Sequence, residues 1–226
     1  MIVAGELWHS NRFIARVVAR VYSYQSDILT LTKKYWPAGL DVRTSATASR
    51  NNKETLSYAS TGIAQSTHLS GEMFKRAAKI EMQHVPYRGG SQAVQDVIAG
   101  RVPLMINGLA STLPLIADGR LRAIGVTSID RSPAAADIPT LAEQGLPGFD
   151  VTAWYGLSAP AKTPPAIVEE LNREINEILA LEDIRKQVLV NGATPSGGTP
   201  EAYQTFIQSE LDRFGALAKE INLSIN

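Results

Sequence analysis

Small hydroxylated residues gather where a strand pattern runs into a helix pattern. The stretch LSYASTGIAQSTHLSGEMFKRA (56–77) holds Ser60, Thr61, Ser66 and Thr67. The first amides of a helix have no partner within it, and the helix dipole makes this end attractive to a carboxylate or phosphate. Ser66 or Thr67 is expected to cap the helix, which leaves a second hydroxyl for a ligand. The alternative is that Ser66 caps the helix and nothing binds.

The same arrangement recurs at two later strand ends. In VPYRGGSQAV a strand ends at Tyr87, and Gly89 and Gly90 allow the backbone to come close to a group above the next helix. Arg88 either pairs with an anion there or stays solvated beside the turn. In MINGLAS a strand ends on Asn107, followed by Gly and small residues. Ligands of open α/β sheets lie beyond the carboxyl ends of the strands, so these three ends together predict a site for a small anion.

Groups suited to catalysis or metal binding are scarce by comparison. His9, His68 and His84 lack the spacing of metal ligands. Ser66 and His68 lie two residues apart on one helical turn, where side chains do not face each other, so they are no nucleophile–base pair. The stretch GIAQST lacks the Gly-Lys-Ser/Thr ending of a phosphate-binding P-loop. We therefore expect no catalytic residues, no metal and no cofactor.

Composition excludes several classes of partner. Lys and Arg number 22 and so do Asp and Glu, whereas a nucleic-acid or anionic-membrane surface needs a basic excess. The absence of cysteine excludes disulfides and thiol nucleophiles. The chain has no apolar run of membrane-spanning length, and its start, MIVAGELWHSNRF, lacks a signal-peptide pattern, so the chain as written predicts a cytoplasmic location. Asp96 and Asp118 stand alone and are expected to be solvated.

Short apolar strands alternate with helices from residue 56 onward, which predicts an α/β fold with a largely parallel sheet. Strands are expected at 56–60, 82–87, 102–107, 121–128 and 151–160, and helices at about 66–77, 91–99, 164–181 and 200–221. Thr163 is the expected N-cap of the third helix, and at most a short helix is expected around Leu141. The apolar face of the third helix comprises Ile167, Val168, Leu171, Ile175, Ile178 and Leu179. Residues 23–55 show no clean period and predict a loop or a poorly ordered segment.

Three blocks of the sequence carry a resemblance to a known family. The blocks LSYASTGIAQSTHLSGEMFK, HVPYRGGSQAVQDVIAGRVPLMINGLAS with its continuation to EELN, and GGTPEAYQTFIQSEL span Leu56 to about Asn222. In order, spacing and residue type they resemble the tripartite tricarboxylate transporter substrate-binding family, also called Bug receptors. The resemblance implies a two-lobed α/β fold of the type II periplasmic-binding-protein kind. It also implies a periplasmic receptor that binds a small organic anion between its lobes and serves a membrane transporter.

The resemblance also assigns residues to the ligand site. In the family a Ser/Gly/Thr-rich loop precedes a His-Leu helix whose N-terminus faces the cleft, and the YRGG and MINGLAS loops reach the same cleft. Ala64 departs from the family pattern, because a second Gly is usual there, and this is expected to stiffen the loop. Gln65 also departs, because a small residue is usual. The matching positions are Ser60, Thr61, Gly62, Ser66, Thr67, His68, Tyr87, Arg88, Gly89, Gly90, Asn107 and Ala110.

The start of the chain departs more strongly from the family. FIARVV (13–18) resembles the family's crossing segment, whereas the export signal, first strand, Gly-rich loop and long helix of lobe one have no counterpart. The prediction is an N-terminally truncated member with lobe one incomplete. Residues 1–22 would be a remnant of lobe one and the crossing segment, 23–150 lobe two, and 151–226 the hinge strand and C-terminal helices of lobe one. A local frameshift over 19–53 would produce this pattern.

The residues and the resemblance together predict a receptor for a small carboxylate or related anion, with no enzymatic activity. Two alternatives stay open, namely a degenerate fragment that binds no ligand and a Ser-dependent hydrolase. Because closure of two lobes on the ligand supplies part of the binding free energy, an incomplete lobe one predicts weak binding. It also predicts self-association through exposed apolar faces of the helices at 164–181 and 200–221.

Overall fold

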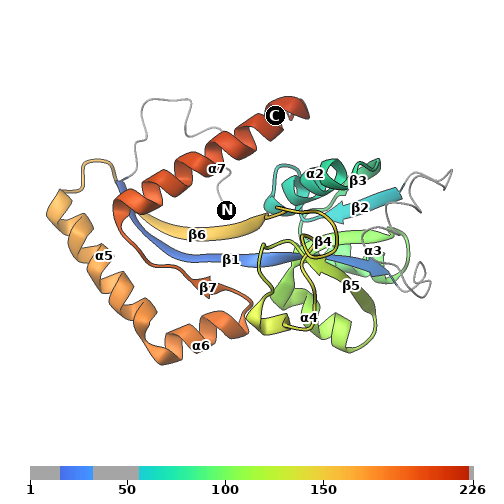
Figure 1. The fold of residues 1–226 in the computed structure, drawn as a ribbon, viewed down its shortest axis with the longest axis horizontal. Coiled ribbons are helices and arrows are strands. Elements are labelled where there is room, and N and C mark those ends of the chain that lie inside the picture. Colours follow the sequence, from blue (N-terminus) through green and yellow to red (C-terminus); the bar gives the residue numbers. More distant parts are fainter. Residues whose placement is uncertain (1–15, 33–55, 224–226) are drawn as a thin grey trace. The chain divides into compact units, whose positions relative to one another are not determined.

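The computed structural model describes residues 16–32 and 56–223, with side chains from residue 27 onward (Figure 1). The predictions made for residues 1–15 and 33–55 lie outside the described residues. In chain order the elements are β1 (Arg16–Thr32), β2 (Leu56–Ser60), α2 (Ser66–Ala78), β3 (Met82–Pro86), α3 (Gly90–Ile98), β4 (Leu104–Gly108), α4 (Leu109–Ala117), β5 (Leu121–Val126), a 3-10 helix (Pro133–Ala135), β6 (Thr152–Ala159), α5 (Pro165–Ala180), α6 (Glu182–Val190), β7 (Thr194–Pro195) and α7 (Pro200–Glu220).

The described chain divides into two compact units. Residues 25–32 and 56–153 form the first, which we call the sheet unit, and residues 16–24 and 154–223 form the second, the helical unit. β1 and β6 contribute residues to both units. None of the helices in the described ranges has the length and apolar character that crossing a membrane requires.

The sheet unit is built on strands in the order β3-β2-β4-β1-β5 (Figure 1). β2 pairs in parallel with β3 and with β4, whereas β1 runs antiparallel to both β4 and β5. β5 therefore runs in the same direction as β2, β3 and β4. The predicted largely parallel sheet is confirmed, with β1 as its reversed strand. Among the described strands, β5 is joined to the sheet through β1.

Residues 23–32 belong to strand β1, so the prediction of a loop or poorly ordered segment is wrong for them. From residue 27 on, both the apolar and the polar side chains of this strand are buried, including Ile28, Leu29, Asp27 and Thr30. A strand covered on both faces shows no alternation of apolar and polar residues, and alternation is the sequence pattern that indicates a strand.

The core of the sheet unit lies between the strands and the helices that follow them. One buried cluster joins β2, α3, β4 and β5, and consists of Ala59, Ala93, Val97, Val102, Met105 and Leu121. A second joins β1, α4 and β5, and consists of Ile28, Leu109 and Val126. Tyr58 is fully buried beside Gly71 of α2, where an added Cβ atom would overlap the Tyr58 ring. Close approach of α2 to β2 therefore requires glycine at this position.

Strands and helices agree with most of the predicted spans, but two helix starts differ. The strand at 56–60 is confirmed at both ends as β2. The N-cap of α2 is Gln65, so neither Ser66 nor Thr67 occupies that position. The N-cap of α5 is Pro164 rather than Thr163, with Pro165 as the first helical residue. Proline suits that position because its fixed φ is helical and its missing N–H has no partner there. Helices α4 and α6 were not predicted.

Residues 141–145 form turns, where at most a short helix around Leu141 was expected. Thr140 and Glu143 do exchange the two hydrogen bonds of a capping box, at 2.7 and 3.0 Å. Gly145, at φ 104°, and the following Leu-Pro then end the segment before a helix can propagate.

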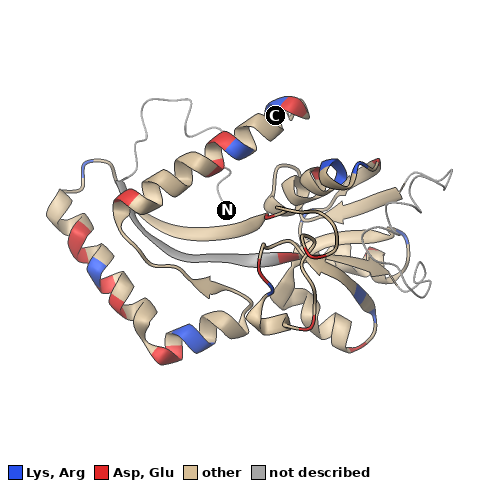
Figure 2. Ribbon diagram, in the orientation of Figure 1, with Lys and Arg blue, Asp and Glu red and all other residues tan. Residues whose placement is uncertain are grey.

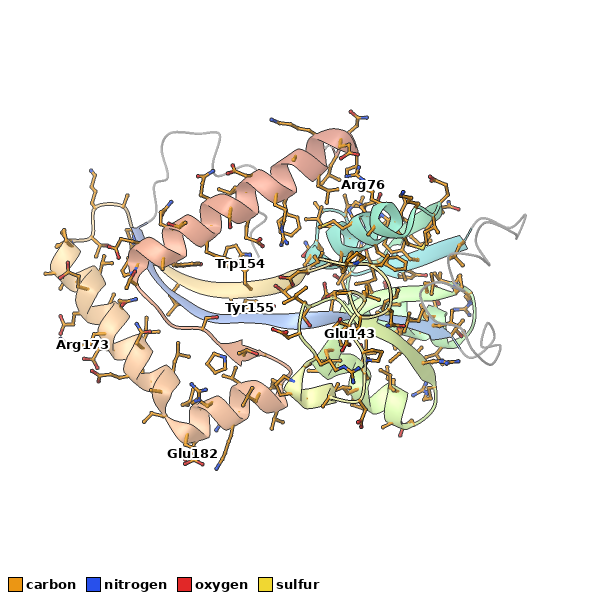
Figure 3. The ribbon with its side chains drawn as sticks, viewed as in Figure 1. Arg76, Glu143, Trp154, Tyr155, Arg173 and Glu182 are labelled. Atoms are coloured by element: carbon orange, nitrogen blue, oxygen red, sulfur yellow. The ribbon has the colours of Figure 1, made fainter. Side chains whose placement is uncertain are left out.

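In the helical unit, Trp154 of β6 lies against α7 (Figure 3). Its Nε1 donates to Glu210 at 3.1 Å, and its ring meets Tyr203 and Phe206 edge-on at 5.9 and 5.3 Å between centroids. Tyr203, Ile207 and Leu217 are buried, as the predicted inward face of this helix requires.

The predicted apolar face of α5 is buried only in part. Val168 packs with Ala159 and Ile175, and Leu179 is also buried. In contrast, Ile167, Leu171 and Ile178 are 42–50% exposed within the described structure. The other side of α5 carries acidic and basic residues close together (Figure 2), among them Arg173, which pairs with Glu174 and Glu177.

Candidate functional site

Three parallel strands of the sheet unit end at the same edge, and a helix follows each of them. In the strand register, Ser60 of β2 lies beside Pro86 of β3, and Ala59 lies beside Met105 of β4. Helices α2, α3 and α4 begin within six residues of these ends, so three helix N-termini share what we call the carboxyl edge. Free amides and aligned dipoles make this edge suited to an anion.

The loop after β2 is held together by its own side chains. Thr67 Oγ1 accepts a hydrogen bond from the Thr61 amide at 3.0 Å and bonds the Thr61 hydroxyl at 2.8 Å. Ser60 is fully buried, and its Oγ accepts from the Gly62 amide at 3.3 Å. These hydroxyls therefore fix the loop, and of the two candidates for a free hydroxyl, Thr67 is engaged within it. Ser66, the first residue of α2, is half-buried.

The same loop contains a residue in an uncommon backbone conformation. Ala64 has a φ of 59°, the left-handed region that costs an L-residue roughly 1 kcal/mol. Its amide donates to His68 Nδ1 at 3.1 Å, and both residues are buried. Glycine would adopt this conformation without the steric cost, which is a physical reason for a second glycine at this position.

A serine–histidine pair lies beneath the loop, and sequence reasoning missed it. Ser60 Oγ is 2.6 Å from His84 Nε2, and the His84 ring stacks on His68 and Tyr58 at 3.9 and 5.0 Å between centroids. Tyr58 and His84 are partners in the β2–β3 register, which brings together residues 24 positions apart. Burial, aided by the neighbouring His68, lowers the pKa of His84 to about 4, and burial also lowers the pKa of His68.

A second buried network holds α2 on β2. The Tyr58 hydroxyl donates to Glu72 Oε1 at 2.8 Å, and Lys75 pairs with the same carboxylate at 2.9 Å. Burial raises the pKa of Glu72, but the hydrogen bonds from Lys75 and Tyr58 outweigh it, and the pKa lies below its usual value. Burial and the adjacent Glu72 raise the pKa of Tyr58. The helix that starts at Ser66 is thus fixed to the strand before it.

The loop after β3 is tied to the loop after β2. The Tyr87 amide donates to the Ser60 carbonyl at 3.1 Å, and the Tyr87 hydroxyl donates to Asp96 at 2.8 Å. Asp96 also pairs with Arg101, so the prediction of a solitary, solvated Asp96 is wrong. Tyr87 lies before α3 and Arg101 after it, so both connections of the helix are tied to Asp96. Tyr87 is half-buried between the two loops.

The rest of this loop leads into α3. Arg88 is exposed and forms no ion pair with the described residues. Gly89 is the N-cap of α3 and has a φ of 127°, which favours glycine, and Gly90 is the first helical residue.

The end of β4 carries Asn107, which is 6% exposed. Its Nδ2 donates to Ser111 Oγ at 3.1 Å and to Thr112 Oγ1 at 3.3 Å, both in the first turn of α4. Ala110, the second residue of α4, is half-buried. The twelve residues assigned by resemblance thus lie at the three strand ends of the carboxyl edge, in the loops there or in the first turns of the helices that follow. A cluster of three His, Asp or Glu side chains that could hold a metal ion is absent from the described residues.

A buried carboxyl group that was not predicted lies next to this edge. Asp27 of β1 is opposite Gly108 of β4, and its Oδ2 accepts from the Ser70 hydroxyl of α2 at 3.1 Å. It is 2% exposed, and burial raises its pKa to about 7, although the Ser70 bond acts in the other direction. Asp27 was not predicted because residues 23–32 were expected to form a loop, whereas they belong to strand β1.

Comparison with proteins of known sequence places this chain among curated relatives. It is 43% identical over 180 residues to the UPF0065 protein in the tcbD-tcbE intergenic region of a Pseudomonas species, which covers 79% of this chain and 54% of that protein. It is 33% identical over 165 residues to BugT of Bordetella pertussis, covering 73% of this chain and 51% of BugT. The chain therefore spans about half the length of these relatives. It covers 98% of the UPF0065 protein in the clcB-clcD intergenic region of Pseudomonas knackmussii, at 37% identity.

Solved structures show the same fold. The R. palustris protein Rpa4515 with adipate superposes with a TM-score of 0.82 at 29% identity, covering 95% of this chain and 71% of that one. MatC from Rhodopseudomonas palustris with bound malate gives 0.74 at 28% identity, covering 88% and 68%. The periplasmic binding protein BugD gives 0.76 at 26% identity, covering 93% and 70%. The fold is that of an α/β periplasmic binding protein.

The family model described as tripartite tricarboxylate transporter family receptor matches residues 30–223. This range includes β2 to α7 and all three loops of the carboxyl edge. The chain therefore belongs to the tripartite tricarboxylate transporter receptor family.

Proposed function

We propose that this protein is a periplasmic solute receptor for a small organic anion with one or more carboxylates, and that it serves a tripartite tricarboxylate-type transporter. The observation that carries the proposal is the meeting of three helix N-termini at the carboxyl edge of a receptor-family chain. The adipate and malate in two related structures support a carboxylate ligand. The transporter as partner rests on the family alone.

Within the sheet unit, we propose that the ligand contacts the three loops of the carboxyl edge. Backbone amides at the start of α2 and α3 would bind a carboxylate, since the Thr61–Thr67 bonds fix the first loop and glycine opens the second. Arg88 would attract the anion from the rim, because it is exposed and without an ion pair among the described residues. Ser60 is fully buried, so its part would be to hold the loop in place. The residues proposed for the site are Ser60, Thr61, Gly62, Ser66, Thr67, His68, Tyr87, Arg88, Gly89, Gly90, Asn107 and Ala110.

A Ser-dependent hydrolase is the competing function, and the Ser60–His84 pair at 2.6 Å is the observation that favours it. The chemistry of the pair argues against it. A general base works best with a pKa near the working pH, and the pKa of His84 is about 4. Ser60 is fully buried, which keeps a substrate carbonyl from its hydroxyl. We therefore propose that the pair is structural and that the protein has no enzymatic activity.

Titration calorimetry against a panel of di- and tricarboxylates tests the proposal. We expect binding by at least one member, and a Thr67→Val variant that binds about 1–2 kcal/mol more weakly, because the loop loses both bonds to Thr61. Thr205→Val is the matched control, since the Thr205 hydroxyl bonds only a carbonyl of its own helix, α7. Heat from no member of the panel would refute the receptor function. Ester hydrolysis that disappears in a Ser60→Ala variant would establish the hydrolase instead.

A further inference from the structure

The orientation of the Asn107 side chain is fixed by the two hydroxyls that follow it. Ser111 Oγ and Thr112 Oγ1 each donate to the Gly108 carbonyl at 2.9 Å. A hydroxyl has a single hydrogen, so both groups can only accept from Asn107. The amide nitrogen Nδ2 is therefore the atom that faces α4, and the amide oxygen Oδ1 faces the other way.

Oδ1 lies at the N-terminus of α3 within the carboxyl edge. A Cβ atom added to Gly90, the first residue of α3, would be 3.2 Å from it. Asn107 is 6% exposed, and no donor among the described residues bonds Oδ1. Oδ1 is not among the fully buried side-chain atoms without a partner, so it is open to a group from outside. The edge thus contains a fixed acceptor that is available to a donor from outside the described chain.

The surroundings of Oδ1 decide which donor suits it. A carboxylate has only acceptor oxygens, so it is directed to the helix amides and away from Oδ1. An ammonium group is disfavoured there by the positive end of the α3 dipole. The carboxylate of Asp96, further along α3, is already paired with Tyr87 and Arg101. A neutral hydroxyl meets none of these penalties.

We infer, on the basis of the proposed receptor function, that Asn107 Oδ1 accepts a hydrogen bond from a hydroxyl group of the ligand. Asn107 is then a specificity-determining residue, and the ligand class is a hydroxylated carboxylate rather than the same acid without its hydroxyl. Glycine at position 90 serves the same specificity, because a Cβ atom there would lie 3.2 Å from Oδ1 and crowd it.

Titration calorimetry with malate, succinate and aspartate tests this inference, since the three acids differ only in a hydroxyl, a hydrogen or an ammonium at one carbon. We expect malate to bind about tenfold more tightly than succinate, the effect of one well-placed hydrogen bond. In Asn107→Ala the ratio should fall to near one, mainly through weaker binding of malate. Asn191→Ala removes an exposed amide that bonds only a carbonyl of α6 and should leave the ratio unchanged.

The possible outcomes separate this inference from the receptor function. Equal affinity of the wild-type protein for malate and succinate overturns the inference alone, because a water molecule on Oδ1 would then serve both acids. Tighter binding of aspartate than of malate, or a ratio that survives in Asn107→Ala, overturns it too. Should that variant not fold, the wild-type ratios still decide. Absence of binding by all three acids and by the wider panel overturns the receptor function together with the inference.

Discussion

The ends of β2 and β4 use similar residues in opposite ways. After β2, the side chains of Ser60, Thr61, Thr67 and His68 bond one another or nearby backbone amides, so the loop is self-contained. After β4, two hydroxyls turn back on the Gly108 carbonyl and hold Asn107 with its oxygen unpaired. The first loop therefore offers mainly backbone amides, and the second offers a side-chain acceptor. Residue types that predict a polar site thus do not tell which groups remain for a ligand.

The largest expected effect is a loss of stability on the β2 side of this comparison, caused by separating α2 from β2. Gly71→Ala places a Cβ atom in the Tyr58 ring, so α2 must move away from β2 and disturb the Tyr58–Glu72 bond. We expect a loss of about 3 kcal/mol in the free energy of unfolding, as for other overpacked cores. Urea unfolding followed by circular dichroism measures it. Gly215→Ala is the control, because Gly215 in α7 has open space around it and alanine is the better helix former. Equal stability of the two variants would contradict the prediction.

The next effect concerns Asp27, which lies opposite the end of β4 and bonds Ser70 of α2. Its pKa is about 7 in the folded state and 3.8 for an ordinary exposed aspartate, so the folded state holds the proton more tightly. This stabilises the fold below pH 3.8, and the stabilisation is lost as the pH rises through 7. Asp27→Asn cannot ionise, so we expect it to be about 2 kcal/mol more stable than the wild type at pH 8 and similar at pH 4. A difference that does not grow with pH would show that Asp27 is not protonated by burial.

Ala64→Gly tests how much the loop after β2 is strained, and its expected effect on the free energy of unfolding is smaller. Glycine removes the steric cost of the left-handed conformation at φ 59°, although it adds chain entropy to the unfolded state. We expect a net gain of about 0.5 kcal/mol in the free energy of unfolding. Lys79, at φ 53°, is exposed at the end of α2, and Lys79→Gly should give a similar gain without touching the loop. A destabilised Ala64→Gly beside a stabilised Lys79→Gly would mean that the Ala64 methyl packs more favourably than its backbone is strained.

The smallest expected effect is that of Arg88→Gln on carboxylate binding. An exposed charge at the rim contributes little affinity and is screened by salt, so we expect less than a threefold rise in Kd, and less still at high ionic strength. Titration at two salt concentrations measures it, with Arg120→Gln, another exposed arginine of the sheet unit, as control. A loss of affinity as large as that of Thr67→Val would show that Arg88 contacts the ligand directly and does not act only from the rim.

Local patterns were enough to predict most of the sheet unit. Strand β2 was found at both ends because a short apolar run is bounded by Ser, Thr and Gly, and α3 was found from its apolar period and the glycine after it. β1 was missed beyond residue 22, since a strand buried on both faces does not alternate. Helix α4 was missed because its glycine start and internal Pro114 are turn signals in sequence.

Contacts between distant residues explain what could not be predicted at the site. The Ser60–His84 pair depends on the register of two parallel strands, which sequence spacing does not determine. The orientation of Asn107, in contrast, depends on hydroxyls four and five residues later, and this spacing at a helix start is visible in the sequence. Both the family and the fold were found from sequence blocks, and the structural comparison agrees with them.

The reversed strand β1 also affects how this unit assembles. Asp27 contacts Thr127, which lies 100 residues later, whereas β2, β3 and β4 meet through short helical connections. Loop-closure entropy therefore favours the parallel strands as the first to associate, with β1 entering afterwards between β4 and β5. Since β5 joins the described sheet through β1, its amides should gain protection from hydrogen exchange together with those of residues 27–32, and later than those of β2.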